Sequence, residues 1–293
     1  MALQYKLLPA LQFKASTGKN HQYISQLINL EFDELGVNNQ IWALADDDEI
    51  PVINARQHTL GFIYRKQGWQ FDIEAYHKKL LGITSFTTSF ISQANEDNYS
   101  EGTATIQGID LLLKKKWNKY QTWLSYTLSK ADYLFEEIQV ETFPSFNDQR
   151  HVLSWVHLWK FPRFDISVGW NMASGLPYTD FEETKIDTDF PDDEDLIAVV
   201  SPIYDLFNTN TLANTHRLNA SILYTFPDKS ASKKWEAKAG LSFTNIYNKA
   251  NIYTRRFDEQ YFYEDDELED EVIIVEKRLL QFFPNVHFRV AWK

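Results

Sequence analysis

The sequence predicts an all-β protein, an antiparallel meander of the kind that forms transmembrane barrels. Three observations support this fold class. Apolar and polar residues alternate over strand-length segments, short and long connections alternate between those segments, and charged and aromatic residues gather at particular connections. Together these regularities are typical of a membrane barrel, whose strands run between short turns on one side of a bilayer and long loops on the other.

The strands are predicted from period-two alternation. In residues 69–76, Trp69 and Phe71 lie on one face, whereas Gln70 and Asp72 lie on the other. A period of two over this length indicates a strand with one apolar face. The same pattern covers further segments along the chain, namely 164–173, 217–226, 235–244 and 286–292.

The connections between these segments fall into two length classes. Short turns are expected near Gln67-Gly68, Lys116-Trp117-Asn118, Phe161-Pro162 and Pro227 to Lys233. Long loops are expected over about 23–53, 83–100, 132–148, 177–213 and 256–271. Segments long enough to cross a bilayer at a tilt suit this arrangement better than the short strands of a soluble sheet.

Charge separates the two ends of the predicted strands. Acidic runs fall in the long loops, at 46–49, 192–195 and 265–271, whereas bases gather beside the short turns, as at Lys114, Lys115 and Lys116. Aromatic residues flank the same short turns: Trp69, Trp117, Tyr120, Trp159, Phe161, Phe164, Phe226 and Trp235. Such rings form a belt at the headgroup depth of a membrane barrel.

Composition excludes several other classes. The chain has 293 residues, a net charge of −12 and no cysteine. The excess of acids argues against nucleic acid as a partner, because phosphate binding needs a basic face. No apolar run approaches the roughly 18 residues of a membrane-spanning helix.

Several motifs resemble the barrel of the TonB-dependent outer-membrane receptors of Bacteroidetes-type bacteria. They are Phe71 to Lys79, Gly102 to Leu111, Ser125 to Lys130, Phe146 to His151, Ser174 to Tyr178, Asn245 to Asn248 and Pro284 to Trp292. Their order and spacing cover nearly the whole chain. The resemblance implies a whole barrel of about 22 strands. We count about ten strands in this sequence, with the tail of another at Leu3 to Tyr5. We therefore expect residues 1–293 to be the C-terminal portion of such a barrel, either open or incomplete, without the plug domain and signal peptide.

The resemblance also implies a function for the whole receptor. Such a receptor takes up a scarce nutrient, such as a ferric siderophore, cobalamin or a glycan, and is energised through TonB. The expected partners are outer-membrane lipid, the plug domain, the remaining barrel strands, TonB through the N-terminal part, and a surface lipoprotein over the loops. The expected location is the outer membrane, with the long loops extracellular.

Two other functions are compatible with the pattern. One is a stand-alone small outer-membrane channel or adhesin barrel, which an even number of strands would permit. The other is a soluble surface β-sandwich that binds glycans or hydrolyses them with two of its carboxylates. The sandwich predicts that Phe71, Ile73, Val168, Trp170, Leu241 and Phe243 are buried in a protein core, whereas a barrel exposes them to lipid.

No catalytic or cofactor motif is found. A P-loop, an H-E-x-x-H motif and a G-x-S-x-G motif are all absent, so we expect neither an enzyme nor a bound cofactor. His151 and His157 lie about 20 Å apart along one predicted strand and cannot share a metal ion. The acidic runs could bind Ca²⁺ weakly, through Asp46, Asp47, Asp48, Asp192, Asp193 and Asp195, although solvated loop tips are the simpler interpretation.

Two further groups of residues are candidates for a functional role. Aromatic residues in the long loops could stack on a cargo or pack the loops together: Tyr178, Phe181, Tyr204, Phe207, Tyr261 and Tyr263. Charged residues at polar strand positions should face the lumen, where the resemblance implies contact with a plug: Asp72, Glu74, Arg217, Glu236, Lys238 and Arg289. For residues 147–150, a turn-and-cap role is favoured, because Asn and Asp satisfy local backbone donors.

Overall fold

The computed structural model describes residues 1–29, 39–46, 50–84, 100–188, 196–204, 206–227, 235–263 and 271–292. These residues form one large antiparallel sheet and four small ones. The large sheet has twelve strands, eleven of which follow one another along a single path. None of the described residues forms a helix that could cross a membrane.

The path through the large sheet follows the chain order, as in a meander. It begins with β1 (Ala2–Leu8), β2 (Leu11–Gln22), β5 (Ile53–Lys66), β6 (Trp69–Thr84), β7 (Glu101–Lys116) and β8 (Tyr120–Phe135). It continues with β10 (His151–Lys160), β11 (Phe164–Ala173), β16 (Thr215–Phe226), β17 (Trp235–Thr244) and β21 (Phe283–Trp292), while β9 (Gln139–Pro144) pairs with β8. The predicted number of strands is thereby confirmed, with β1 as the additional tail.

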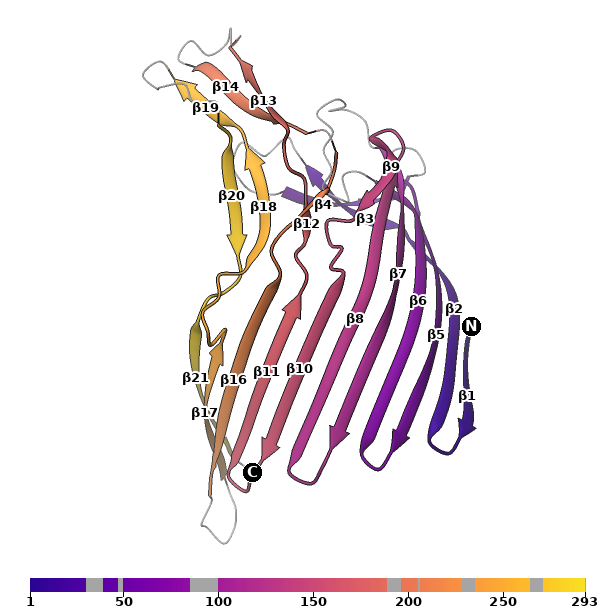
Figure 1. Cartoon of the computed structure of the whole chain (residues 1–293), viewed down its shortest axis with the longest axis vertical. Helices are drawn as coiled ribbons and strands as arrows, with labels where there is room; N and C mark the ends of the chain where they lie inside the picture. Colours follow the sequence, from indigo (N-terminus) through magenta and orange to yellow (C-terminus); the bar gives the residue numbers. More distant parts are fainter. Residues whose placement is uncertain are drawn as a thin grey trace.

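The sheet is open. Among the described residues, β1 pairs with β2 alone and β21 pairs with β17 alone, so the path has two free edges and does not close into a ring. Figure 1 shows the sheet as a wall of tilted strands, with the N-terminal strand at one side and β21 at the other. The all-β meander and the incomplete barrel predicted from the sequence are both confirmed.

Short turns and long loops lie at opposite ends of this wall (Figure 1). Between β5 and β6 the turn is two residues long, and Gln67 and Gly68 have φ angles of 49° and 79°. Two consecutive positive φ angles are characteristic of the tight hairpin turn that matches the twist of a β-sheet. The predicted short turn at this position is confirmed.

The long loops contain the four small sheets. β3 (Ile24–Asn29) pairs with β4 (Asn39–Leu44), β12 (Pro177–Tyr178) with β15 (Asn210–Thr211), and β18 (Ile252–Asp258) with β20 (Ile273–Arg278). β14 (Leu196–Ile203) lies between β13 (Glu183–Asp187) and β19 (Gln260–Tyr263).

The predicted boundaries of the last long loop were wrong. The loop was expected to cover about 256–271, whereas the connection from β17 to β21 covers 245–282. Strands β18 and β20 pair with each other and not with the wall. Neither strand has the regular apolar–polar alternation of the wall strands, so the pattern from which the wall was predicted does not mark them.

One face of the wall carries the large apolar side chains. Cross-strand neighbours on this apolar face include Phe62 with Ile73, and Trp155 with both Leu124 and Trp170. Phe62 is 40% exposed and Trp155 46% exposed, as in a surface that lies against lipid.

The burial that a sandwich requires is not observed. Phe71 and Leu241 are 39% and 44% exposed, and Ile73, Val168, Trp170 and Phe243 are of intermediate exposure. The described residues contain one large sheet and four small ones, and not the two large facing sheets of a sandwich.

The two buried apolar clusters lie at the long-loop end. The first, called here the rim core, consists of Ile53, Ile83, Ala104, Phe135 and Phe143, which lie where β5 to β8 meet β9. The second, the loop core, consists of Ala198, Val200, Phe257, Phe262 and Val272, all within the small loop sheets or beside them. The protein therefore concentrates its apolar burial in the loops, while the wall exposes its apolar face.

Candidate functional site: the polar wall and the loop layer

A network of three charged residues lies on the polar face, near the N-terminal edge of the wall. Lys14 on β2 lies opposite Gly61 on β5, which in turn lies opposite Glu74 on β6. Because Gly61 has no side chain, Lys14 extends across β5, and its Nζ lies 2.9 Å from both Asp72 Oδ1 and Glu74 Oε2. A Cβ at Gly61 would lie only 2.8 Å from Lys14 Cε. The glycine therefore allows one lysine to hold both predicted wall carboxylates.

The other predicted wall residues lie near the C-terminal edge. Lys238 on β17 lies opposite Arg289 on β21, and its Nζ is 2.6 Å from Glu236 Oε1. These three residues line a hollow of about 120 Å³ on the polar face. Arg217 lies on β16, opposite Asn171 of β11. The register thus places all six predicted wall residues on the polar face, but in separate groups.

Three of the predicted loop aromatics pack together against the loop core. Tyr178, Phe181 and Tyr204 contact this cluster, and the rings of Phe181 and Phe257 lie 4.9 Å apart in an edge-to-face arrangement. The Tyr204 hydroxyl donates a hydrogen bond of 3.1 Å to the Phe257 carbonyl oxygen. Burial raises the pKa of Tyr204, with a smaller contribution from the nearby carboxylates of Asp258 and Glu259.

Arg255 connects this aromatic group to the β18–β20 hairpin. Its Nη2 lies 2.6 Å from Glu276 Oε1, and its guanidinium group lies 5.3 Å from the centre of the Tyr178 ring. Arg278 also donates to Glu276, at 3.1 Å. Hydrogen bonds from Arg255 first and Arg278 second hold the pKa of Glu276 below its usual value. One carboxylate therefore fixes two strands of the hairpin and orients the cation that covers Tyr178.

The three remaining loop aromatics have different surroundings. Phe207 packs against the rim core, with its ring 5.8 Å from that of Phe143. Tyr261 and Tyr263 on β19 are 53% and 48% exposed, more than the other four. The Tyr261 hydroxyl donates to Glu259 Oε2 at 2.9 Å, and this hydrogen bond raises the pKa of Tyr261. The six aromatics therefore do not form one rim.

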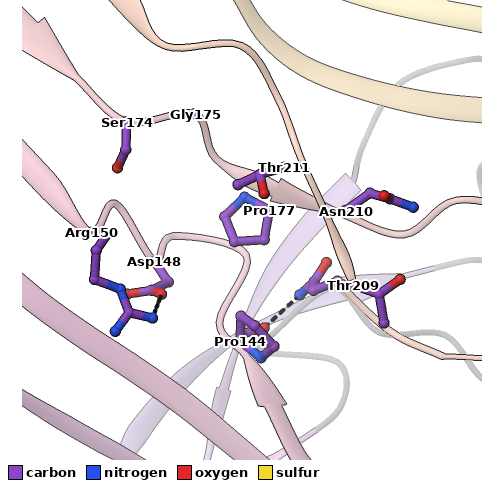
Figure 2. Close-up of a pocket in the computed structure, with 10 residues that line it drawn as sticks. Pro144, Asp148, Arg150, Ser174, Gly175, Pro177, Thr209, Asn210 and Thr211 are labelled. Atoms are coloured by element: carbon purple, nitrogen blue, oxygen red, sulfur yellow. Dashed lines mark hydrogen bonds and ion pairs between the residues drawn. The ribbon is translucent and has the colours of Figure 1, made fainter.

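A cavity of about 220 Å³ lies where three loops converge above β10 and β11. Figure 2 shows Arg150 and Asp148 on one side of this cavity and Thr209 and Asn210 on the other. Gly175 also lines the cavity. Its position requires a glycine, because a Cβ there would collide with the Leu212 backbone. A cavity of this size holds a few water molecules or one small polar group, since drug-sized ligands need at least about 300 Å³.

The carboxylate in this cavity has a structural role. Asp148 Oδ1 accepts the backbone N–H of Ala131 at 2.9 Å, while Oδ2 accepts Arg150 Nη2 at 3.0 Å. The Asn147 N–H donates to Ser145 Oγ at 3.3 Å. The predicted turn is present, because the Asp148 N–H donates to the Ser145 carbonyl oxygen at 2.8 Å. The predicted local capping is not what the side chains do: the donor that Asp148 satisfies lies on β8, and the cap of the Asn147 N–H is Ser145.

The acidic runs lie almost entirely outside the described residues. This applies to Asp47, Asp48, Asp192, Asp193 and Asp195, so the weak Ca²⁺ sites stay a prediction. Asp46 is described, and its Oδ1 accepts the Ile50 N–H at 2.9 Å, which closes a local turn. Within the described part of the chain, no three potential metal ligands gather.

The two histidines of β10 occur separately, each with a tyrosine. His157 Nδ1 lies 2.6 Å from the Tyr120 hydroxyl, and His151 Nδ1 lies 2.8 Å from the Tyr126 hydroxyl. Both pairs lie on the apolar face, where a polar group facing lipid needs a hydrogen-bond partner.

Sequence reasoning missed the residues that organise these contacts. Lys14 and Gly61 are 47 positions apart, and only the register between β2 and β5 brings them together. Arg255 and Glu276 pair across a hairpin that was not predicted, because the expected loop over 256–271 separates the two residues. A glycine within an alternating strand was the one available signal, because such a glycine often marks a close approach.

Comparisons with known proteins give no match in sequence. No family model matches the chain, and no curated protein matches it. Solved structures do match. The ferric citrate transporter FecA in its unliganded form aligns with a TM-score of 0.57 and 10% identity, over 99% of this chain and 37% of FecA.

Two further structures give a similar result. FpvA of P. aeruginosa, bound to heterologous pyoverdines, aligns with a TM-score of 0.55 and 10% identity, over 99% of this chain and 32% of FpvA. The copper transporter OprC aligns with a TM-score of 0.52 and 11% identity, over 99% of this chain and 39% of OprC. The chain thus spans 32–39% of the length of these TonB-dependent receptors. Its resemblance to their barrel is confirmed for the fold.

Proposed function

We infer that this chain, which has the fold of part of a TonB-dependent receptor barrel, belongs to an outer-membrane receptor that imports a scarce nutrient with energy supplied through TonB. The observation that carries the proposal is the open wall, which aligns over 99% of its length with part of a much longer transporter. Residues 1–293 would form one continuous portion of the barrel. The wall contributes the lipid-facing surface and part of the lumen, and we propose no catalytic activity for it.

Two free edges favour this function over a stand-alone small channel. A barrel spans a membrane only when every backbone N–H and C=O group is paired. Because β1 and β21 do not pair with each other, further strands have to close the ring. In the proposed receptor the rest of the protein supplies these strands. It also supplies a plug domain, which contacts the charged polar face.

Growth of the native bacterium tests the proposal. The gene is deleted, and growth is measured with ferric siderophores, cobalamin or a glycan as the limiting nutrient. Loss of growth on one of them, restored by the gene only when TonB is present, is the expected result. A passive solute of similar size is the control. Uptake that continues unchanged without TonB would contradict the proposal.

We further propose that the exposed rings of Tyr261 and Tyr263 contact the cargo. Replacing both with alanine should raise the cargo concentration for half-maximal uptake by about thirtyfold, because stacking on an aromatic ring contributes about 1 kcal/mol for each of the two rings. Tyr5→Ala, on an exposed ring of the wall, is the control. Equal uptake by the double variant and the control would exclude cargo contact.

A further inference from the structure

Three bases lie side by side on the apolar face of the wall. Lys19 on β2 lies opposite Arg56 on β5, and Arg56 lies opposite Lys79 on β6. All three side chains are exposed. None forms an ion pair with another residue of the part of the chain that the structure describes. We call them the basic row.

The register shows that the basic row shares a face with the lipid-facing side chains. Along β5 the exposed positions are every second residue, from Arg56 through Leu60 and Phe62. Along β6 the same alternation connects Lys79 to Phe71 and Trp69. Between the apolar residues and the basic row lie His58 and His77, which are direct neighbours across the strands.

The height of the basic row fits the outer edge of a membrane. Trp69 adjoins the short turn, and Lys79 lies on the same strand near the long-loop end. The strand rises by about 33 Å between these two residues, which corresponds to about 25 Å across a bilayer at a tilt of about 40°. An apolar band of about 25 Å is the height expected between the two interfaces of a membrane barrel. The basic row is thus level with the headgroups on the long-loop side.

Charge repulsion makes the row unfavourable without a ligand. Like charges directly opposite each other destabilise a pair of strands. A carboxylate on the same face, that of Asp132 on β8, is separated from Lys79 by Thr105 of β7. Asp132 already pairs with Lys130 at 2.7 Å. An anion between the three bases would relieve the repulsion, and the planar guanidinium of Arg56 is suited to bidentate contact with phosphate.

We propose that Lys19, Arg56 and Lys79 bind the phosphate of a lipid headgroup in the outer leaflet of the membrane. This inference rests on the proposed outer-membrane location, because only a membrane-embedded wall brings these bases to headgroup level. A phosphorylated glycolipid fits best, since its acyl chains lie along the apolar face below the row while its phosphate lies between the bases.

Lipid binding by the purified protein tests the site. The protein, expressed from its complete reading frame, is embedded in phosphatidylcholine nanodiscs and titrated with lipid A. In the test variant, Lys19→Gln, Arg56→Gln and Lys79→Gln are combined. In the control, Lys6→Gln, Lys78→Gln and Lys114→Gln remove the same charge from the opposite face. Each base near an anionic surface contributes about fivefold in affinity, so the test variant should bind at least tenfold more weakly, and the control should stay within threefold.

Three results would overturn the lipid site. They are equal weakening in the test and control variants, equal affinity for lipid A whose phosphates have been removed, and displacement of lipid A by inorganic phosphate at the same concentration. Failure of the proposed function would be distinguishable. A wild-type protein that does not belong in a membrane would not embed in phosphatidylcholine nanodiscs before any lipid A is added, whereas a passive channel would embed but support uptake without TonB in the growth experiment.

Discussion

The ion network on the polar face depends on one residue that carries no charge. Lys14 reaches Asp72 and Glu74 because Gly61 leaves the space above β5 empty. The three charged residues are only partly exposed, so their attraction is screened less than that of a fully exposed pair. The missing side chain of Gly61 therefore determines where the charged side chain of Lys14 can lie.

Gly61→Ala should therefore destabilise the protein by about 1–3 kcal/mol, the usual cost of overpacking. The new Cβ would meet the Ile73 carbonyl oxygen and displace Lys14. Gly169→Ala is the matched control, because its Cβ would lie 3.7 Å from Val156 Cγ2 in ordinary contact. The free energy of unfolding in urea, measured in detergent micelles, distinguishes the two. Equal losses in both variants would show that Lys14 has room to move.

Glu276 provides a pH-dependent contact in the loop layer. Its pKa is lowered in the folded state by Arg255 and Arg278, so the folded state binds fewer protons than the unfolded state. The stabilisation is complete above the unfolded pKa of about 4.3 and is lost as the pH falls through the lower folded value. We expect β18 and β20 to lose protection from hydrogen exchange in acid.

Glu276→Gln should produce the same loss of protection at pH 7 and remove its pH dependence. Glu183→Gln, at an exposed position on β13 without an ion pair in the described residues, is the control. Hydrogen exchange of 252–258 and 273–278, followed from pH 7 to pH 3, measures the effect. Unchanged acid sensitivity in Glu276→Gln would assign the transition to another group.

Among the elements, the loop that precedes β15 anchors the loop layer to the wall. Asn208 Nδ2 donates to the Pro144 carbonyl oxygen at 2.8 Å, and the Phe207 N–H donates to Gln139 Oε1 at 3.2 Å. Asn208 has a φ of 54°, a left-handed conformation that Asn tolerates better than most residues. These contacts attach a loop from between β14 and β15 to β9, on the far side of β10 and β11.

Substitutions at Asn208 should distinguish the stability that comes from its side-chain hydrogen bond from the stability that comes from its backbone conformation. Asn208→Gly keeps the conformation and loses the side-chain bond, at a cost of about 1 kcal/mol. Asn208→Ala also incurs about 1–2 kcal/mol of left-handed strain. Protection of 139–144 from hydrogen exchange should therefore fall in the order wild type, Gly, Ala. Thr209→Ala, at the adjacent position, should have little effect. The reverse order of Gly and Ala would contradict the role of φ.

At the scale of the whole molecule, the two free edges determine what the wall can do. In lipid each unpaired N–H or C=O group costs several kcal/mol, so β1 and β21 require partners. In a membrane the apolar face would have no such requirement, because lipid would cover it. The wall is therefore stable in a membrane only as part of a larger ring.

Expression of residues 1–293 alone should fail to give a membrane-inserted barrel. Co-expression with the remaining strands of the receptor should restore it, because both edges then find partners. Resistance of the inserted barrel to SDS before heating, seen as a shift in gel mobility, measures closure. A heat-sensitive mobility shift for residues 1–293 alone would show instead that β1 and β21 pair with each other, as a small stand-alone barrel requires.

The sequence by itself determined the strands, their two faces and the separation of short turns from long loops. These features are local, because alternation and turn residues act over fewer than about ten positions. Tertiary structure decided which residues meet. The pairing of Lys14 with Asp72 and Glu74, the hairpin of β18 with β20 and the basic row of Lys19, Arg56 and Lys79 all depend on cross-strand register. Register is set by long-range pairing, and a shift of one residue would have moved each of these side chains to the other face.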